Sequence, residues 1–384
     1  MVHTVAEITE IFAREDHDAK VTKASEVPTS YDSITTAWLT DVICRGSPGA
    51  EVAAFSFDAR DDGSSNRRRI FITYNEAGQA AGLPATVFCK AAEGLLNRIV
   101  LGTSGTARAE MDFYNKVRRR LEIEAPEGLY AGFDANSYAS LIMLRDLAGA
   151  AEFCDDRTQI DWNRAAGQID TLARLHSRFY ESPELGSETI PFRTWPVWWR
   201  NMMVASPEFA ASCDQAFADS EELMEPELYR QRDRIWPATE MSVARHLELP
   251  RTLIHCDVHL KNWYVAKNGA MGLSDWQIAS VGHWSRDLIY TMTTALTVEN
   301  RRKWEKELVR LYLDKMAERG VPQVSEEETW TNLRQQLFSA LAFWTITLNP
   351  APGMPDMQPL RTTQAFLRRL YAAITDHEAL KSFG

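Results

Sequence analysis

The stretch that most constrains the fold runs from Thr252 to Trp276 and reads TLIHCDVHLKNWYVAKNGAMGLSDW. An apolar start leads into a loop that carries three polar candidates, His255, Asp257 and Asn262. The strand-like segment WYV follows, and Asn268-Gly269 is a strong two-residue turn signal. The stretch therefore predicts a β-hairpin whose return strand ends at Asp275.

Such a hairpin brings Asp275 back beside the loop that holds Asp257 and Asn262. Two carboxylates and an amide oxygen are the hard ligands that suit Mg²⁺, and a carboxylate beside the metal can act as a base. Each residue alone is explained by turn chemistry, because Asp and Asn favour loops through hydrogen bonds to their own backbone. The ordered set of HxDxxxxN, strand, turn, strand and Asp is more specific than any of its members.

The composition describes an ordinary globular protein and argues against one class of partner. The 384 residues are 45% hydrophobic and 25% charged, so the chain can bury a substantial core in one large domain or two. The formal net charge of -11 argues against a nucleic-acid partner, because binding one requires a basic stripe. Two arginine triplets, at 67–69 and 118–120, are local exceptions that we interpret as solvated faces.

Further features of the sequence predict a cytoplasmic protein. No uninterrupted apolar run approaches the roughly 20 residues that a membrane span needs, so no span is expected. The first 20 residues are charged throughout and lack the apolar segment of a secretory signal. The five cysteines are scattered and form no CxxC pair, which predicts reduced thiols and no structural zinc site.

The first part of the chain has the alternating pattern of antiparallel strands. The strand candidates are, in order, VAAFSFDAR, RRIFITYN, ATVFCK, LYAGFDA and YASLIMLRDL. The first two are separated by DDGSSN, and AGQAAGLPA is interpreted as a second polar turn. Between the third and fourth candidates, residues 106–120 predict a helix that packs on the sheet.

The later part of the chain has helical periodicity. A long helix is expected from Trp162, and we interpret its His176 as a core histidine because no second ligand lies one turn away. The Trp- and Met-rich segment 195–203 either packs inside this part or lines an acceptor pocket. Three further helices are predicted over residues 299–319, 326–347 and 358–378.

The segments IHCDVHLKNWYV and LSDWQ together resemble the aminoglycoside phosphotransferase superfamily, and DWQ is typical of its ecdysteroid-kinase-like (CHK kinase-like) branch. The resemblance implies an α+β, two-lobed protein-kinase-like fold, with a five-stranded antiparallel N-lobe and a mostly helical C-lobe. It implies an N-terminal helix and linker over residues 1–30 and a nucleotide-binding N-lobe over 31–147. A helical C-lobe with the catalytic loop and the acceptor pocket would occupy 148–384.

The resemblance also implies roles in binding ATP and Mg²⁺. Asp257 would be the catalytic base, and Asn262 and Asp275 would hold the metal. The cofactor-binding candidates are Lys90 with its ion-pair partner Glu110, Ser64 and Ser65 in the first turn, and Leu144 and Asp146 at the hinge. A plain hairpin turn remains the alternative for the two serines, and Arg108 or Asp112 replaces Glu110 if the register slips.

Residues beside the catalytic set have structural roles in the resembled family. His255 would brace the loop against the strand that carries Asp275, and Asp287 would hold the loop through backbone N–H groups. His259 stands where protein kinases have a lysine that contacts phosphate, as it does in many aminoglycoside kinases. Lys261 either touches phosphate or points to solvent.

The function implied is transfer of the γ-phosphoryl group of ATP to a hydroxyl of a small organic acceptor, with a lipophilic alcohol as the first candidate. An alternative is a polar cationic acceptor, as in aminoglycoside or choline-like kinases, which the acidic net charge would attract. A different class is a nucleotide-binding pseudokinase. The intact set of Lys90, Asp257, Asn262 and Asp275 favours an enzyme. The sequence does not indicate an oligomeric state.

Overall fold

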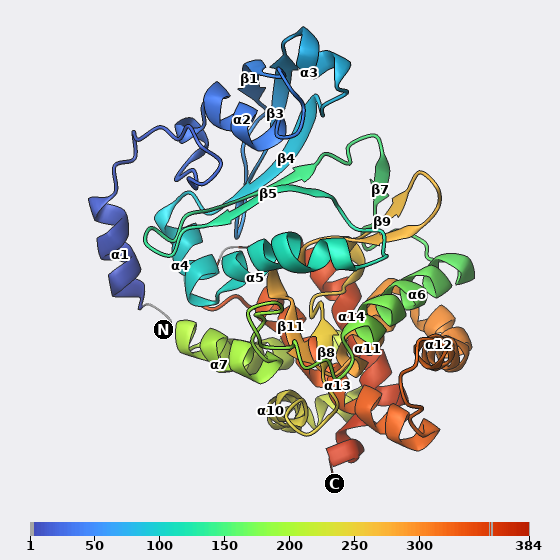
Figure 1. The fold of residues 1–384 in the computed structure, drawn as a ribbon. Coiled ribbons are helices and arrows are strands. Elements are labelled where there is room, and N and C mark those ends of the chain that lie inside the picture. Colours follow the sequence, from blue (N-terminus) through green and yellow to red (C-terminus); the bar gives the residue numbers. More distant parts are fainter. Residues whose placement is uncertain (1–3, 353, 355, 384) are drawn as a thin grey trace. The chain divides into compact units, whose positions relative to one another are not determined.

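The computed structural model describes residues 4–352, 354 and 356–383, and the chain divides into two compact units (Figure 1). The first unit comprises the chain up to Arg120 together with Pro126–Ala150. The second unit comprises Leu121–Ala125 together with the chain from Ala151 onward. Each unit has its own sheet and its own helices, so each is described by itself.

The first unit is built on an antiparallel sheet with the strand order β1-β3-β4-β6-β5. The strands are β1 (Val52–Phe57), β3 (Asn66–Tyr74), β4 (Thr86–Ala91), β5 (Gly128–Phe133) and β6 (Ser140–Arg145). All five predicted strands are therefore present. A two-residue strand, β2 (Asp61–Asp62), pairs with the start of β3 and makes the sheet six-stranded, because part of the predicted first turn is itself extended.

The core of the first unit lies on one face of this sheet. Alternate residues of β3 and β4 point into it, as Ile70, Ile72, Val87 and Cys89 are all buried. Helix α2 (Thr36–Ile43) supplies Trp38, which is fully buried against them. The strand periodicity in the sequence thus records which side chains face the core.

The other helical segments of this unit are α1 (Val5–Arg14), η1 (Tyr31–Ser33), α3 (Glu76–Ala80), α4 (Leu95–Thr103) and α5 (Thr106–Asp112). Residues 106–120 are helical as predicted, but only α5 is a regular α-helix; a π-turn (Phe113–Val117) and a 3-10 turn (Arg118–Arg120) follow it. The polar turn predicted after β3 is wrong in part. The Asn75 side chain accepts the backbone N–H of Gly78 at 2.9 Å and thereby starts α3.

In the second unit, β9 (Trp263–Ala266) and β10 (Met271–Leu273) form the predicted hairpin, and β7 (Ala151–Phe153) extends it on the β9 side (Figure 1). The loop is longer than the expected two residues. Ala266 donates its N–H to the Ala270 carbonyl at 2.9 Å, which leaves three residues at the tip. Gly269 has a φ of 81°, the left-handed conformation that the last tip residue of such a loop requires.

A second small sheet supports the loop that precedes the hairpin. Strand β8 (Thr252–Ile254) delivers the chain to this loop and pairs with β11 (Ser280–Gly282), which follows the hairpin and the 3-10 turn Trp276–Ile278. The 3-10 turn Leu260–Asn262 then leads from the loop into β9. The loop is therefore anchored by strands at both of its ends.

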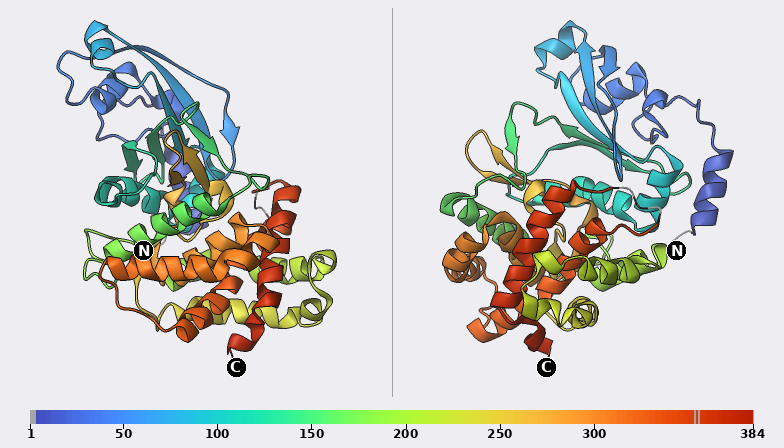
Figure 2. Two further views of the ribbon diagram at one scale, coloured as in Figure 1. Left: turned by 90° about the vertical axis from the view of Figure 1, so that its right-hand side faces the viewer. Right: turned by 180° about the vertical axis from the view of Figure 1, so that it is seen from behind.

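The remainder of the second unit is helical. Its α-helices are α6 (Trp162–Phe179), α7 (Trp195–Ala205), α8 (Phe209–Ala218), α9 (Pro226–Tyr229), α10 (Ile235–Arg245), α11 (Ser285–Ala295), α12 (Val298–Glu318), α13 (Glu326–Leu348) and α14 (Leu360–Asp376). The 3-10 segments are Glu221–Leu223, Arg232–Arg234 and Ala379–Phe383. Helix α13 contacts α8, α10, α11 and α14 and forms the centre of the helical core (Figure 2). The predicted helix from Trp162 and the three predicted C-terminal helices are confirmed.

The tryptophan-rich segment packs inside the second unit. Trp195, Trp198 and Trp199 on α7 are buried, and the rings of Trp195 and Trp198 stack at 5.0 Å. The Arg286 guanidinium lies over the Trp195 ring, 4.0 Å from its centroid. The packing interpretation is therefore confirmed for these three tryptophans. Within the described residues, no helix combines the length and apolar character needed to cross a membrane.

Residues 121–125 belong to the second unit although both flanking segments belong to the first. The backbone N–H of Leu273 on β10 donates to the Glu124 carbonyl at 3.0 Å. The Tyr264 hydroxyl on β9 donates to the Glu124 carboxylate at 2.8 Å. These bonds attach the short segment to the hairpin.

Candidate active site

The loop before the hairpin is held by a buried carboxylate on α11. Asp287 accepts the backbone N–H of His255 at 2.6 Å and that of Cys256 at 2.9 Å, which confirms the predicted contact with backbone N–H groups. His176 on α6 lies 3.2 Å from the same carboxylate and is a hydrogen-bonded core histidine, as expected. Burial alone would raise the pKa of Asp287, but the bonds from His176 and the backbone outweigh it and hold this pKa below its usual range.

His255 links the loop to the strand that leads to Asp275. Its Nε2 lies 3.0 Å from the Ser274 carbonyl, and its Nδ1 accepts the backbone N–H of Asp257 at 3.2 Å. Because a carbonyl only accepts and a backbone N–H only donates, Nε2 carries the proton and Nδ1 does not. Burial lowers the pKa of His255, which is consistent with this neutral form. The predicted brace is confirmed.

The side chains of Asp257 and Asn262 meet within this loop. The Asn262 amide nitrogen donates to the Asp257 carbonyl at 2.7 Å and to its carboxylate at 3.3 Å. The Asn262 carbonyl accepts both the N–H and the hydroxyl of Ser274, at 2.8 and 2.9 Å. With the amide nitrogen engaged, the Asn262 side-chain oxygen is the atom that can coordinate a cation.

Two residues around this loop adopt the left-handed conformation without being glycine. Cys256 has a φ of 69° and Asp275 a φ of 66°. Asp tolerates this region better than most residues, whereas the side chain of Cys256 has a steric cost there that a glycine would not have. The Arg286 guanidinium donates to the Cys256 carbonyl at 3.0 Å and helps to hold this conformation. Strain concentrated at one loop is common at functional sites.

In the first unit, Lys90 on β4 and Glu110 on α5 form the expected ion pair. The Lys90 Nζ lies 3.1 Å from the Glu110 carboxylate, and both side chains are largely buried. The alternative partner in the helix is engaged locally, because Asp112 pairs with Lys116 at 3.1 Å and Arg108 at 3.6 Å. The predicted register of α5 against β4 is correct.

The turn that carries Ser64 and Ser65 is held by side chains from outside it. The Asn97 amide on α4 donates to the carbonyls of Gly63 and Ser64, both at 3.0 Å. The Gly63 N–H donates to the Ser65 carbonyl at 3.0 Å and closes a tight turn. The roles of the two serine hydroxyls in phosphate binding stay a prediction.

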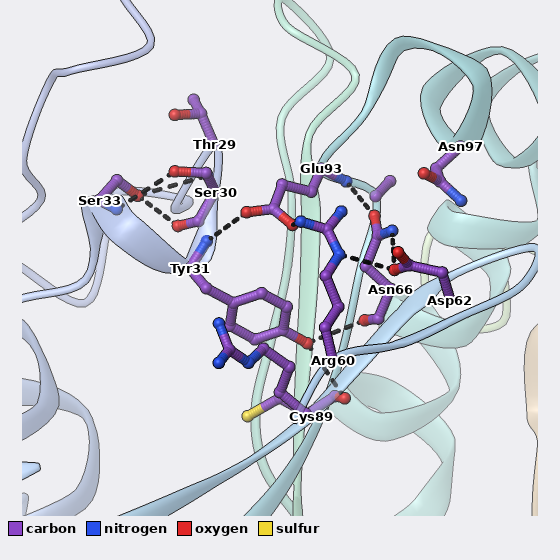
Figure 3. Close-up of polar contacts among 12 residues, drawn as sticks. Thr29, Ser30, Tyr31, Ser33, Arg60, Asp62, Asn66, Cys89, Glu93 and Asn97 are labelled. Carbon is purple, nitrogen blue, oxygen red and sulfur yellow. Dashed lines mark hydrogen bonds and ion pairs between the residues drawn. The ribbon is translucent and has the colours of Figure 1, made fainter. Parts of the chain in front are cut away.

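A polar network extends from this turn toward the N-terminal segment (Figure 3). The Glu93 carboxylate accepts the Tyr31 N–H at 3.0 Å and pairs with Arg60 at 2.9 Å. The Asn66 side chain accepts the Glu93 N–H at 3.0 Å and donates to Asp62 at 2.7 Å. Tyr31 and Glu93 lie far along the chain from the turn and share no motif with it, so sequence reasoning did not find this network.

A sequence model of the phosphotransferase enzyme family (APH) matches residues 84–324, which is more than half of the chain. The chain belongs to the phosphotransferase enzyme family. A search of curated proteins gave no match. The match confirms the superfamily that the hairpin resembles and leaves its ecdysteroid-kinase-like branch a prediction.

Solved structures agree with this phosphotransferase assignment at the level of the fold. A choline kinase from Cryptosporidium parvum is 12% identical with a TM-score of 0.53, covering 88% of this chain and 94% of its own. A Ralstonia eutropha protein assigned to the aminoglycoside phosphotransferases is 13% identical with a TM-score of 0.52, covering 88% and 97%. The predicted α+β, protein-kinase-like fold is confirmed, with an antiparallel N-terminal sheet and a helical C-terminal part.

The donor set of this phosphotransferase-family site fits Mg²⁺ held jointly with a nucleotide. Among the described residues, no cluster of three or more His, Cys, Asp or Glu side chains could hold a metal alone. Mg²⁺ is commonly bound by one or two protein oxygens together with phosphate oxygens and water. Asp275 and the Asn262 side-chain oxygen supply such a partial set. The residues present therefore fit the ion.

The hinge candidates of the phosphotransferase fold are fixed through backbone and side-chain contacts. Leu144 on β6 pairs with Phe88 on one side and with Gly128 on the other. The Asp146 carboxylate accepts from Arg69 at 3.0 Å and from the Ala148 N–H at 2.9 Å. These contacts bind the Asp146 side chain to β3 and to the turn that follows β6. The part of the two residues in adenine binding stays a prediction.

Lys261, whose role the sequence left open, contacts a different part of the phosphotransferase-family chain. Its ammonium group donates a hydrogen bond to the Gln358 side chain, which lies just before α14. The connector between α13 and α14 is thus joined to the catalytic loop at this point.

Proposed function

We propose that this protein transfers the γ-phosphoryl group of ATP to a hydroxyl of a small organic acceptor. The observation that carries the proposal is the Asp257–Asn262 pair, in which one amide nitrogen orients the carboxylate while the amide oxygen is left for a metal. Phosphoryl transfer depends mainly on positioning and charge neutralisation, so a loop fixed by buried bonds suits this reaction.

The base and the metal ligands are assigned to the second unit. Asp257 orients the acceptor hydroxyl and takes its proton as the oxygen–phosphorus bond forms and the bond to the departing ADP breaks. Asn262 and Asp275 would hold Mg²⁺, which neutralises charge on the phosphates when it is bound. His255 acts only by holding the loop.

The nucleotide contacts are assigned to the first unit. Lys90, fixed by Glu110, would bind the α- and β-phosphates. Ser64 and Ser65 would offer hydroxyl and N–H groups to phosphate, and the backbone at Leu144 and Asp146 would bind adenine. We accordingly propose that residues 31–147 bind the nucleotide and that 148–384 bind the acceptor.

Two acceptor classes compete. The DWQ element resembles the ecdysteroid-kinase-like branch and favours a lipophilic alcohol, but the packing of Trp195 and its neighbours removes one argument for an apolar pocket on α7. The net charge of -11 favours a cationic acceptor through electrostatic steering.

All five cysteines are free and buried, which supports a reducing compartment such as the cytoplasm.

A pair of variants tests the proposal with Mg·ATP and a panel of hydroxylated metabolites, with the mass gain of one phosphate as the readout. Asp257→Ala should lower turnover roughly 100- to 10,000-fold and still bind Mg·ATP by calorimetry. Lys90→Met should lower kcat/KM roughly 100-fold.

Lys116→Met is the matched control, because Lys116 pairs with Asp112 in the same helical segment and has no assigned part in binding the nucleotide. It should leave turnover unchanged. Nucleotide binding without transfer to any acceptor, unaffected by Asp257→Ala, would indicate a pseudokinase. A wild-type protein that neither binds nucleotide nor transfers phosphate would overturn the proposal.

A further inference from the structure

The Asp257 carboxylate has a neighbour that the phosphoryl-transfer assignment does not use. The hydroxyl of Tyr290, in the middle of α11, lies 3.4 Å from Asp257 Oδ1. Tyr290 is fully buried, so its hydroxyl must find its partners within the protein. This residue follows Asp287 by one helical turn on the same helix.

The direction of the hydrogen bond at Tyr290 is fixed by Trp344 on α13. The Trp344 Nε1 lies 2.8 Å from the Tyr290 oxygen, and an indole N–H can only donate. The Tyr290 oxygen is therefore the acceptor in that bond, and its own proton needs another acceptor. Among the described residues, Asp257 Oδ1 is the acceptor within its reach. The bonds run from Trp344 to Tyr290 to Asp257.

The phenol remains a donor at any working pH. Burial raises the pKa of Tyr290 well above its usual range, and the nearby charge of Asp257 raises it further. A protonated phenol next to a carboxylate donates to it, and hydrogen bonds to charged groups are stronger than neutral ones.

The second oxygen of Asp257 faces other groups. The Asn262 amide lies 3.3 Å and the His259 Nε2 3.6 Å from Oδ2. The His259 ring meets the Trp344 ring edge-on at 5.2 Å, and burial lowers the pKa of His259, which favours the neutral ring. Trp344 thus packs against the groups on both sides of the carboxylate.

We propose that Tyr290 and Trp344 are a positioning pair for the base: the bond to Oδ1 fixes the rotation of the Asp257 carboxylate, so that Oδ2, which also accepts from Asn262, keeps its remaining lone pair for the acceptor hydroxyl. The inference rests on the proposed function, because it assigns the two residues to the same reaction. Neither residue touches the reacting atoms. Their effect is to restrict the rotation of a carboxylate whose orientation matters for proton transfer.

The proposal predicts a change in kcat without a change in the KM for ATP. Tyr290→Phe removes one hydroxyl and keeps the ring, so it should lower kcat roughly tenfold, the cost of one hydrogen bond to a charged group. Trp344→Phe should lower kcat less, because Tyr290 still reaches Asp257. The double variant should be no slower than Tyr290→Phe alone, since Trp344 acts through Tyr290.

The matched control is Tyr371→Phe on α14. Tyr371 is also a fully buried phenol, and its hydroxyl donates to Ser220 at 3.2 Å, in a contact that does not involve Asp257. This variant should keep the wild-type kcat. Urea unfolding of all variants separates a loss of packing from a loss of orientation, because only the latter lowers kcat of the folded protein.

The experiment uses the full chain with Mg·ATP, with water as the acceptor where no organic acceptor has been identified. In an Asp257→Ala background, Tyr290→Phe should leave the residual rate unchanged. An equal loss in that background, or an unchanged kcat in the single variant, would overturn the positioning role. A wild-type protein that turns over ATP neither with water nor with any hydroxylated metabolite of the panel would instead overturn the proposed function, so the two failures are distinguishable.

Discussion

The catalytic loop of the second unit and the first turn of the first unit are held in opposite ways. In the loop, a fully buried carboxylate, Asp287, accepts two backbone N–H groups. In the turn, a partly buried amide, Asn97, donates to two backbone carbonyls. In each case one side chain fixes two backbone groups. The two side chains differ in their charge and in their contact with water.

This difference predicts how much each of the two side chains contributes to the stability of the protein. Removing a buried acceptor leaves its donors without partners and costs the full desolvation of each group, whereas groups near the surface recover hydrogen bonds from water. Substitution of the side chain that holds the loop should therefore cost much more stability and activity than substitution of the side chain that holds the turn. The base and metal ligands proposed for the loop need a fixed geometry, while the phosphate-binding role proposed for the turn allows it to adapt to a ligand.

The largest expected effect follows from Asp287→Ala. Two buried N–H groups and His176 would lose their acceptor, which should lower the free energy of unfolding by about 3–5 kcal/mol, measured by urea denaturation. The change should also abolish turnover in the protein that remains folded.

Asp155→Ala provides the surface counterpart in the same unit. Asp155 accepts the N–H groups of Arg157 and Thr158, both at 2.9 Å, but in a loop whose residues are half-buried or exposed. Its removal should change the urea midpoint little. Equal losses of unfolding free energy from Asp287→Ala and Asp155→Ala would show that burial does not determine the contribution of such a carboxylate.

An intermediate effect is expected from acid, and it should fall on the second unit. Burial lowers the pKa of His246 to about 3, and it also lowers the pKa values of His255, His259 and His283, all in the second unit. Since these folded-state pKa values are depressed, the unfolded chain binds more protons below its own pKa of about 6.5. Stability is then present above pH 6.5 and is lost as the pH falls.

At pH 5, a histidine that stays neutral in the folded state costs about 2 kcal/mol. Urea midpoints at pH 7.5 and 5, followed by tryptophan fluorescence, report mainly on the second unit, because 11 of the 12 tryptophans lie there. His246→Gln can still bond Gln336 and should flatten the pH dependence. A midpoint that rises toward pH 5 would contradict the assignment of these buried rings as neutral.

The smallest effect is expected from Asn97→Ala. The carbonyls of Gly63 and Ser64 would turn to water, so the KM for ATP should rise only several-fold, or about 1 kcal/mol, with kcat unchanged. Steady-state kinetics at saturating acceptor measures both constants. A large fall in kcat would mean that the turn is as tightly specified as the catalytic loop, and the contrast between the two regions would disappear.

The parts of the site that the sequence predicted are those whose residues lie close together along the chain. His255, Asp257, Asn262 and Asp275 lie in the loop before one hairpin or directly after its second strand, and the hairpin turn is enough to bring them together. The Lys90–Glu110 pair was found from its order in the resembled fold, and the structure shows the bond.

The parts that the sequence did not reveal depend on packing between distant elements. Tyr290 follows the predicted Asp287 by three residues, but its link to Trp344 joins residues 54 positions apart, and no periodicity encodes that contact. Helix α4 was missed, and with it Asn97. Polar residues on helices carry no local signal of the loop that they will hold, because the partner is set by tertiary structure.

The bonds of Glu124 to the hairpin have a consequence for anyone who recombines this protein with a relative. The polypeptide passes from one unit to the other three times, after Arg120, Ala125 and Ala150. A chimera made with a single crossover at 150 would pair a foreign 121–125 segment with the native β9 and β10 strands. Exchanging the first unit cleanly therefore takes three junctions in the gene, with the five codons for residues 121–125 left from the recipient.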